Sequence, residues 1–346
     1  MRGVGSTILL LGMIFLAIVS GCRSSGSERD EEKEASLEPH EYVELVMASP
    51  VIIRVYAASE AHARRTAREA FDRMHALERT LSDWIGDSES NLLEAAAPAS
   101  IPISDDLRDA IAVSRSISRD TDGMFDPTIG PLVELWRRTR NSGFMPSEEE
   151  LRLARGRVDL DSIELDSDGA RITRRDVELD FGAIGKGIAL DAASRILDAR
   201  GLRHHLINFD GEILVGDSPP EKTSWEITIL PSDSEDPIVI DAVRCAVATS
   251  GGVNQFVEID GVRYSHVIDP STGLGVDCAR QVTVICSRAT HADALATVGC
   301  ILPTKRFEEM LRARFEEVSA VVLENDGGSL TVTRIGDPPV QAPAVP

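Results

Sequence analysis

A turn containing three glycines and one lysine is the first place where residue type and spacing point to chemistry. It lies within residues 180–191 and contains Gly182, Gly185, Lys186 and Gly187. Glycines let a backbone approach a ligand closely, and N–H groups at a helix start attract phosphate. The turn is not a P-loop, which would need a Gly in place of Asp180 and Ser or Thr in place of Gly187. On this pattern alone, a phosphate cradle and a plain tight turn remain open.

A second candidate is the segment 290–298, whose sequence predicts a helix capped by Thr290. Asp293 and Thr297 are four residues apart, so they lie about one turn apart on one helix face. A carboxylate and a hydroxyl are hard oxygen ligands, which suit Mg²⁺ when phosphate and water complete the shell. The alternative is structural: Thr290 and Asp293 fit a capping box, and Thr297 could bond back to the carbonyl of Asp293.

A third candidate is the segment 264–273, in which a predicted strand carries His266 to a turn containing Asp269. A histidine and a carboxylate could transfer a proton or orient a phosphate. The turn could equally be structural, with Asp269 bonding its own backbone. A serine nucleophile is not indicated, because no serine lies in a G-x-S-x-G elbow.

Two further segments combine small polar or large apolar residues with turn signals. Residues 248–252 place Thr249, Ser250 and Gly251 at the end of a predicted strand, where a plain strand-end turn is the alternative. Residues 123–136 contain two prolines and two glycines, which fix a loop leading into a short helix. Phe125 and Trp136 in this segment either pack in the core or form the wall of a site for a flat ring.

The elements that position these residues can be predicted from apolar spacing. Apolar and polar residues alternate over 177–181, which indicates a half-buried strand before the glycine turn. Apolar residues then recur every four positions over 188–196, which predicts a helix ending near Gly201. Further helices are expected over 59–81, 104–119, 147–155 and 304–315, and residues 82–91 read as a polar loop.

Most of the remaining chain reads as short strands. The first strand region is expected over 42–56, and Asp260-Gly261 is a favourable hairpin turn between strands over 256–259 and 263–268. Other strands are expected over 205–209, 212–215, 225–230, 238–240, 246–249, 281–286, 320–323 and 330–334. Runs of strands with few helices predict an α+β fold with largely antiparallel sheets and flanking helices, not a doubly wound α/β fold.

Composition limits the function classes. The chain has 346 residues, 42% hydrophobic and 27% charged, which is typical of a globular protein. The net charge of −21 argues against a nucleic-acid partner, because phosphate backbones need a basic face. An acidic protein that binds an anion must gather its few cations locally or recruit a metal.

The N-terminus is predicted to be a targeting segment. Arg2 is followed by an apolar stretch over 7–19, which is too short to span a membrane comfortably. Small residues then precede Cys22, which resembles the bacterial lipoprotein box. We therefore expect a signal peptide over 1–21 and an acylated Cys22 that holds the protein at the periplasmic face of a membrane. The composition of the segments 22–40 and 336–346 predicts that both are disordered.

Four other cysteines occur, and none forms a C-x-x-C pair. They are Cys245, Cys278, Cys286 and Cys300. Zinc binding and thioredoxin-like chemistry are therefore not indicated. Disulfides and buried free thiols both remain open.

The residues of these motifs and their order along the chain resemble those of the ApbE family of FAD:protein FMN transferases. The resemblance covers roughly residues 42–335, the span of one such domain. The matching motifs are FDPTIGPLV at 125–133, LDFGAIGKGIALD at 179–191, Ile207-Asn208 with Gly211, TSG at 249–251, SHVIDPSTG at 265–273 and ADALAT at 292–297. The resemblance implies a T-fold-like α+β domain, which we assign to residues 41–335, with FAD in a cleft between two lobes.

The resemblance also implies a ligand set. Asp293, Thr297 and the backbone carbonyl of Ala183 would bind Mg²⁺, and the metal would bridge the phosphates of FAD. The residues implied to contact the flavin nucleotide are Met47, Phe125, Asp126, Gly182, Ala183, Gly185, Lys186, Asp191, Thr249, Ser250, Gly251, His266 and Asp269. The implied catalytic groups are His266, Asp293 and Lys186.

The implied reaction follows the template of phosphoryl transfer. Mg²⁺ and Lys186 would neutralise charge that develops on the pyrophosphate. A Ser or Thr hydroxyl of a target protein would attack the FMN-side phosphorus, and AMP would leave. Targets would carry a flavinylation motif, as membrane electron-transfer subunits do. His266 would orient the phosphates or move the proton.

Three departures from the family pattern keep alternatives open. Asp210 precedes Gly211 where the family has Gly-Gly, and Met47-Ala48-Ser49 replaces Met-Gly-Thr. Residues 252–254 lack the usual aromatic residue. The alternatives are a Mg²⁺-dependent FAD pyrophosphatase that gives FMN and AMP, and a non-catalytic flavin-binding lipoprotein.

Overall fold

The computed structural model describes residues 36–229, 237–252, 255–277, 279–325 and 330–337. Residues 1–35, with the expected signal peptide, Cys22 and most of the expected tether, lie outside this range. So do Cys278, residues 253–254 and most of the expected C-terminal tail. Among the described residues, no helix is both long and apolar enough to span a membrane.

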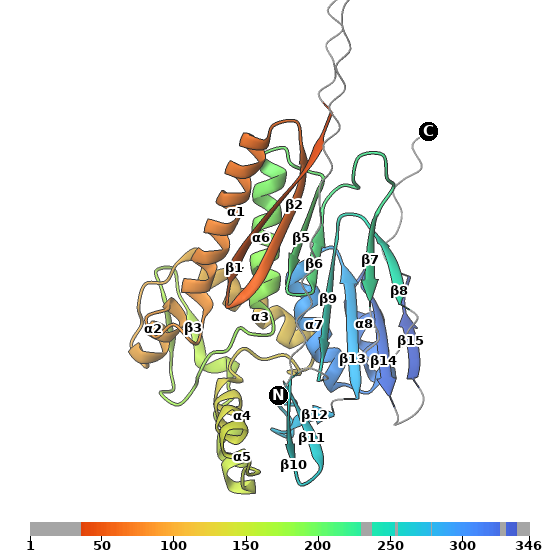
Figure 1. Cartoon of the computed structure of the whole chain (residues 1–346). Helices are drawn as coiled ribbons and strands as arrows, with labels where there is room; N and C mark the ends of the chain where they lie inside the picture. The colour runs from red at the N-terminus through yellow and green to blue at the C-terminus, as the bar shows by residue number, and fades with distance from the viewer. Residues whose placement is uncertain (1–35, 230–236, 253–254, 278, 326–329, 338–346) are drawn as a thin grey trace, which may run out of the picture. The chain divides into compact units, whose positions relative to one another are not determined.

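An eight-stranded antiparallel sheet is the main layer of the fold (Figure 1). Its strands, in spatial order, are β1 (Glu38–Val46), β2 (Ser49–Ala57), β5 (His205–Phe209), β6 (Glu212–Val215), β9 (Cys245–Gly251), β13 (Arg280–Cys286), β14 (Ser319–Asn325) and β15 (Leu330–Ile335). The α+β fold with antiparallel sheets that the sequence predicts is therefore confirmed. The expected first strand region is in fact a hairpin of two strands, and β1 begins at Glu38, inside the expected tether.

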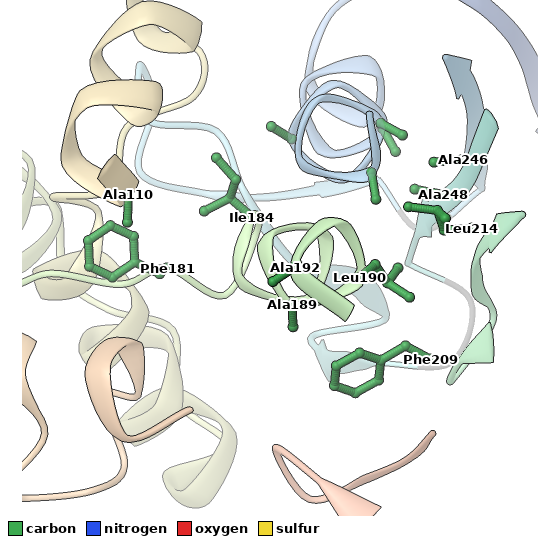
Figure 2. Packing of buried hydrophobic residues seen from close by; sticks show 14 of the residues in the cluster. Ala110, Phe181, Ile184, Ala189, Leu190, Ala192, Phe209, Leu214, Ala246 and Ala248 are labelled. Atoms are coloured by element: carbon green, nitrogen blue, oxygen red, sulfur yellow. The ribbon is translucent and has the colours of Figure 1, made fainter. Parts of the chain in front are cut away.

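Helices cover one face of this sheet and a hairpin covers part of the other. Helices α1 (Glu60–Leu81), α6 (Gly185–Ala199) and α7 (Ala289–Ile301) contribute to the larger hydrophobic core. Leu190 of α6 points toward Phe209, Leu214 and Ala248 of the sheet (Figure 2). Strands β7 (Trp225–Ile229) and β8 (Ile238–Ala242) pack on the opposite face as a second core. The central helix α6 is therefore held on the sheet by apolar contacts along its length.

A smaller group of elements carries the predicted His266 turn. It consists of α4 (Gly130–Ser142), α5 (Glu148–Arg155), β10 (Phe256–Ile259), β11 (Val262–Ile268) and β12 (Gly275–Asp277), which appear together at the bottom of Figure 1. Trp136 Nε1 donates to the carbonyl oxygen of Gly273 at 2.8 Å, and its ring lies 5.3 Å from that of Tyr264. These contacts fasten the turn after His266 to the helix that follows the Phe125 loop. We call this group the α4–β11 lobe.

The remaining helices and strands agree with most of the predicted ones. Helix α3 (Asp105–Asp120) begins after its Ser104 cap, and α8 (Thr304–Arg314) ends one residue earlier than expected. The prediction for residues 82–91 was wrong in part, because Ser88 caps a short helix, α2 (Glu89–Ala96). Two short strands, β3 (Ile163–Leu165) and β4 (Ala170–Ile172), form a separate hairpin.

The strand expected before the glycine turn is not part of a sheet. Residues 177–181 are extended and alternate between buried and half-buried, but they form only one isolated bridge, between Glu178 and Ile129. Burial on one side produces the period-two pattern without any ladder partner. Three of the cysteines, Cys245, Cys286 and Cys300, are buried free thiols in the described structure.

The hairpin between β1 and β2 turns through two residues with positive φ, Met47 at 49° and Ala48 at 58°. A left-handed conformation costs a residue with a Cβ about 1–2 kcal/mol, and glycine avoids this cost. We expect Ala48→Gly to raise the free energy of unfolding by about 0.5–1 kcal/mol, after the added chain entropy of glycine is subtracted. Thermal or urea unfolding would measure this change.

A helical alanine provides the opposite control. Ala112→Gly, at an exposed position in the interior of α3, should lower the free energy of unfolding by about 1 kcal/mol. Equal losses in the two variants would show that Ala48 is not strained in this turn.

Candidate functional site

The glycine turn ends the extended segment and begins α6. The Asp180 carboxylate accepts a hydrogen bond of 2.7 Å from the backbone N–H of Gly182, which fixes the turn. Ile184 caps α6 without a side-chain hydrogen bond in the described structure. A Cβ placed on Gly185 would have no atom within 4 Å. The start of α6 therefore has space beside Gly185 and no side-chain cap, as a phosphate cradle requires.

Helix α7 approaches the same turn at Gly187. The N–H of Gly187 donates to Asp293 Oδ2 at 2.9 Å. A Cβ on Gly187 would lie 2.4 Å from the carbonyl oxygen of Ala289, so only glycine permits this approach. This contact joins the first two sequence candidates, which are far apart in the chain.

Asp191 also ties α6 to α7. Its carboxylate accepts hydrogen bonds from the N–H groups of Ala289 and Thr290, at 2.9 and 3.1 Å, and from the Thr290 hydroxyl at 2.6 Å. These bonds satisfy the open N-terminus of α7. Asp191 thus has a structural role here, and its expected contact with the nucleotide stays a prediction.

The capping-box alternative for Asp293 is wrong. Helix α7 begins at Ala289 after Arg288, so Thr290 is not its cap. The Thr290 hydroxyl donates to Asp191, and Asp293 is bonded to Gly187. The Asp293 side chain is therefore directed to the glycine turn and not back to its own helix start.

Glu212, at the start of β6, is a member of this site that the sequence interpretation missed. Its Oε1 forms an ion pair with Lys186 Nζ, and the residue is only 4% exposed. Burial and the nearby Asp293 carboxylate raise the pKa of Glu212, although Lys186 opposes the shift. Burial also raises the pKa of Asp293, and Lys186 lowers it. No sequence motif marked Glu212, because its part in the site depends on strand β6 lying beside α6.

Lys186 is the cation of this cluster. Burial by itself would lower the pKa of the Lys186 ammonium, but the carboxylates of Glu212, Asp293 and Asp210 together raise it. Lys186 therefore stays charged at neutral pH. Burial raises the pKa of both the Glu212 and the Asp293 carboxyl, so this pair with its one ammonium favours an added proton or cation.

A divalent cation would take the place of such a proton, so the residues fit the expected Mg²⁺. Asp293 is buried with one oxygen bonded to the N–H of Gly187, and its carboxyl lies within hydrogen-bond reach of the Glu212 carboxyl. The hydroxyls of Thr297 and Ser250 lie 3.3 Å apart, which places Ser250 beside a predicted ligand. In the described part of the chain, no three His, Cys, Asp or Glu side chains are placed so that they could hold a metal ion together, so a metal here would need mixed oxygen donors.

Thr249 and Gly251 are placed differently from Ser250. The Thr249 hydroxyl bonds to the Thr283 hydroxyl at 2.9 Å across β9 and β13. Gly251 lies close to Gln281, and a Cβ there would be 3.2 Å from the nearest backbone oxygen, that of Arg280. Among the described contacts of this predicted motif, only Ser250 bonds to helix α7.

The side chain of His266 is exposed on one side. The protein around it lowers its pKa by desolvation, and the positive charges of Arg140 and Lys186 lower it further. Its Nδ1 lies 3.3 Å from the carbonyl oxygen of Gln255. That bond assigns the proton to Nδ1 and leaves Nε2 as an acceptor. His266 is thus a neutral group within electrostatic range of Lys186.

Asp269 and Asp126 both have local structural partners. Asp269 accepts from the N–H of Ser271 at 2.7 Å, the bond to its own backbone that the sequence left open. Asp126 accepts from the N–H and hydroxyl of Thr128, at 2.8 and 2.6 Å. Their contacts with a nucleotide stay predictions.

The large apolar residues of the 123–136 loop pack in cores. Phe125 is 4% exposed and belongs to the main core, and Trp136 is 1% exposed and belongs to the α4–β11 lobe. Met47 is half-buried against the main core. The core alternative is therefore confirmed for Phe125 and Trp136, and the expected flavin contacts of Phe125 and Met47 stay predictions.

A comparison with models of protein families identifies the family to which these motifs belong. A model of the ApbE family matches residues 47–322, which include the glycine turn, the His266 turn and helix α7. This chain belongs to the ApbE family. The family resemblance seen in the sequence motifs is thereby confirmed.

Relatives of this ApbE protein carry a common description. The FAD:protein FMN transferase of Treponema pallidum is 29% identical over 337 residues, covering 90% of each chain. That of Klebsiella pneumoniae is 28% identical over 286 residues, covering 80% of this chain and 82% of the other. That of Escherichia coli K12 is 29% identical over 241 residues, covering 65% and 67%.

Solved structures of ApbE proteins have the same fold. The apo flavinyl transferase ApbE of Pseudomonas stutzeri matches with a TM-score of 0.77 and 24% identity, covering 86% of this chain and 95% of that one. The ApbE protein of Thermotoga maritima matches with a TM-score of 0.75 and 26% identity, covering 85% and 96%. The expected ApbE-type α+β architecture is thus confirmed over most of the chain.

Proposed function

We propose that this ApbE protein transfers FMN from FAD to a Ser or Thr hydroxyl of a target protein and releases AMP, with Mg²⁺ as its cofactor. The observation that carries the proposal is the hydrogen bond between Gly187 and Asp293. It brings the glycine turn and the Lys186 ammonium next to helix α7, which carries Asp293 and Thr297. A cradle for phosphate, a cation and oxygen ligands for a metal are the parts that phosphoryl transfer needs.

The chain's own groups have separate tasks in this proposal. The turn from Gly182 to Gly185 and the start of α6 hold the pyrophosphate, and Lys186 stabilises negative charge that develops on it. Asp293, Thr297 and the carbonyl of Ala183 would hold Mg²⁺, which supplies Lewis-acid stabilisation of the phosphates when bound. The new bond joins the acceptor oxygen to the FMN phosphorus, and the bond to the AMP oxygen breaks.

His266 is the proposed proton acceptor for the attacking hydroxyl. Its Nδ1 is bonded to Gln255, and its lowered pKa leaves Nε2 unprotonated at neutral pH. The rate of transfer should therefore be constant near pH 7 and should fall on the acid side of about pH 6.5, the ordinary pKa of histidine. A pH profile of kcat/KM would measure this limb.

A substitution at His266 tests the assignment of that limb. In His266→Asn the remaining activity should lack the acid limb, since the titrating base is gone. If the variant keeps the same pH profile as the unmodified protein, another group is the base.

We also propose that the protein is a lipoprotein anchored by an acylated Cys22 at the periplasmic face of a membrane. The small residues before Cys22 support this proposal. Membrane electron-transfer subunits that carry a flavinylation motif are the proposed targets. Metabolic labelling with a fatty-acid analogue, compared between the unmodified protein and Cys22→Ser, tests the anchor, because only the former should be labelled.

One incubation tests the reaction itself. The purified protein is mixed with FAD, Mg²⁺ and a protein that carries a flavinylation motif, and the target is examined for flavin fluorescence after denaturing electrophoresis. Fluorescent target with an equal amount of AMP supports transfer. AMP without labelled target indicates FAD hydrolysis, and neither product indicates a flavin-binding protein without catalysis. Both of the latter outcomes contradict the proposal.

A further inference from the structure

Glu212 is a buried carboxylate whose position calls for an explanation. It is the first residue of β6, directly after the Asp210-Gly211 turn, and one of its oxygens is paired with Lys186. The same carboxyl also lies within hydrogen-bond reach of the Asp293 carboxyl. Burying two adjacent carboxyls beside a single ammonium costs several kcal/mol. Packing alone would be served better by an apolar side chain of similar size.

One ammonium and two carboxylates meet at this point. Lys186 is paired with Glu212, and Asp293 is near enough to attract its charge as well. Asp293 is held by the N–H of Gly187 at 2.9 Å, so its position does not depend on Lys186. Without Glu212, the Asp293 carboxylate would be the remaining buried anion for Lys186. An ammonium paired with Asp293 would then compete with any metal for the same oxygen atoms.

We propose that Glu212 is a positioning residue that holds Lys186 away from Asp293 and so keeps the Asp293 carboxylate open to a divalent cation. This inference rests on the metal site of the proposed function. It assigns Glu212 a part in cation binding although it need not touch the cation. Residues that orient a metal ligand in this way typically contribute about 10–100-fold to metal affinity.

A double-variant experiment separates this role from a direct effect of the Glu212 charge. Mn²⁺ serves as the probe for the Mg²⁺ site, and the loss of its free electron paramagnetic resonance signal gives the Kd without any turnover. Glu212→Gln keeps the shape of the side chain and removes its charge. Lys186→Met removes the ammonium that Glu212 is proposed to hold.

The expected result is a strong dependence on Lys186. Glu212→Gln should raise the Kd for Mn²⁺ by about tenfold or more in the unmodified background. In the Lys186→Met background, the same substitution should change the Kd by less than about threefold, because no ammonium remains to be diverted. An equal rise in both backgrounds would mean that Glu212 acts through its own charge, and it would overturn the inference. So would an unchanged Kd in Glu212→Gln alone.

Two controls complete the design. Glu226→Gln removes a carboxylate from an exposed ion pair with Lys222, and it should leave the Kd unchanged. Thermal unfolding of each variant verifies that it is folded before binding is measured. If Glu212→Gln proves unfolded, Glu212→Met is used in both backgrounds, with the same expected dependence on Lys186.

Failure of the inference can be distinguished from failure of the metal site. If Asp293→Asn loses Mn²⁺ binding while Glu212→Gln keeps it, the metal site holds and the inference is wrong. If Asp293→Asn binds Mn²⁺ as tightly as the unmodified protein, the metal assignment itself is wrong, and the inference falls with it.

Discussion

Asp293→Ala is expected to lower the rate of FMN transfer by roughly 10³-fold, because a metal at the phosphates supplies several kcal/mol of charge stabilisation. Asp293 is the only carboxylate among the predicted metal ligands, and it is bonded to the glycine turn through Gly187. Its removal takes away a metal ligand and the contact that joins α7 to the turn. Transfer of FMN to a target protein, measured at saturating Mg²⁺ and FAD, gives the rate.

A surface aspartate provides the matched control. Asp241, on β8, is exposed and bonded to Ser224, and Asp241→Ala should leave the transfer rate unchanged. Asp293→Ala removes a buried carboxyl that packs beside Glu212 and Lys186, so its folded fraction is verified by thermal unfolding. An Asp293→Ala protein that is folded and transfers FMN at the normal rate would remove Asp293 from the site.

Among Gly→Ala substitutions in the site, Gly187→Ala should have the largest structural effect. The added Cβ would lie 2.4 Å from the carbonyl oxygen of Ala289 and 2.7 Å from the Cα of Thr290. Both are backbone atoms, so α6 and α7 must move apart. We expect the free energy of unfolding to fall by about 1–3 kcal/mol, together with loss of the bond to Asp293. Chemical denaturation measures the free energy, and Mn²⁺ binding reports on Asp293.

Gly185→Ala is the matched control two residues earlier in the same helix. A Cβ at Gly185 meets no atom within 4 Å, and alanine is the better helix former. Its free energy of unfolding should therefore be unchanged or higher. If both variants lose the same stability, the close approach of α7 at Gly187 is not what destabilises Gly187→Ala.

Local sequence patterns predicted most of the secondary structure because their signals are local. The helices after Ser59 and Ser104 begin at capping residues that bond backbone N–H groups within the next turn. The Asp260-Gly261 hairpin follows from the positive φ of both residues. Alternation over 177–181 was misleading, because it reports burial on one side and not a partner strand.

The site was predicted in part, and the missing part is long-range. Asp293 and Lys186 lie in recognisable motifs, so their types and spacing could be interpreted from the sequence. Glu212 lies in an ordinary strand and enters the site only because β6 runs beside α6. Asp191 belongs to a recognisable motif, but its bonds to α7 depend on the packing of two helices. Such pairings are not encoded at any fixed sequence spacing.

The hydrogen bonds between α6 and α7 also determine which parts can move. Gly187 and Asp191 fasten one helix to the other at points four residues apart, and the two helices share the main core. The proposed phosphate cradle and the proposed metal ligands Asp293 and Thr297 are therefore fastened together. The α4–β11 lobe has its own small core and carries His266. Any closure around a bound nucleotide would thus be a hinge motion that brings the base to a preassembled anion and metal site.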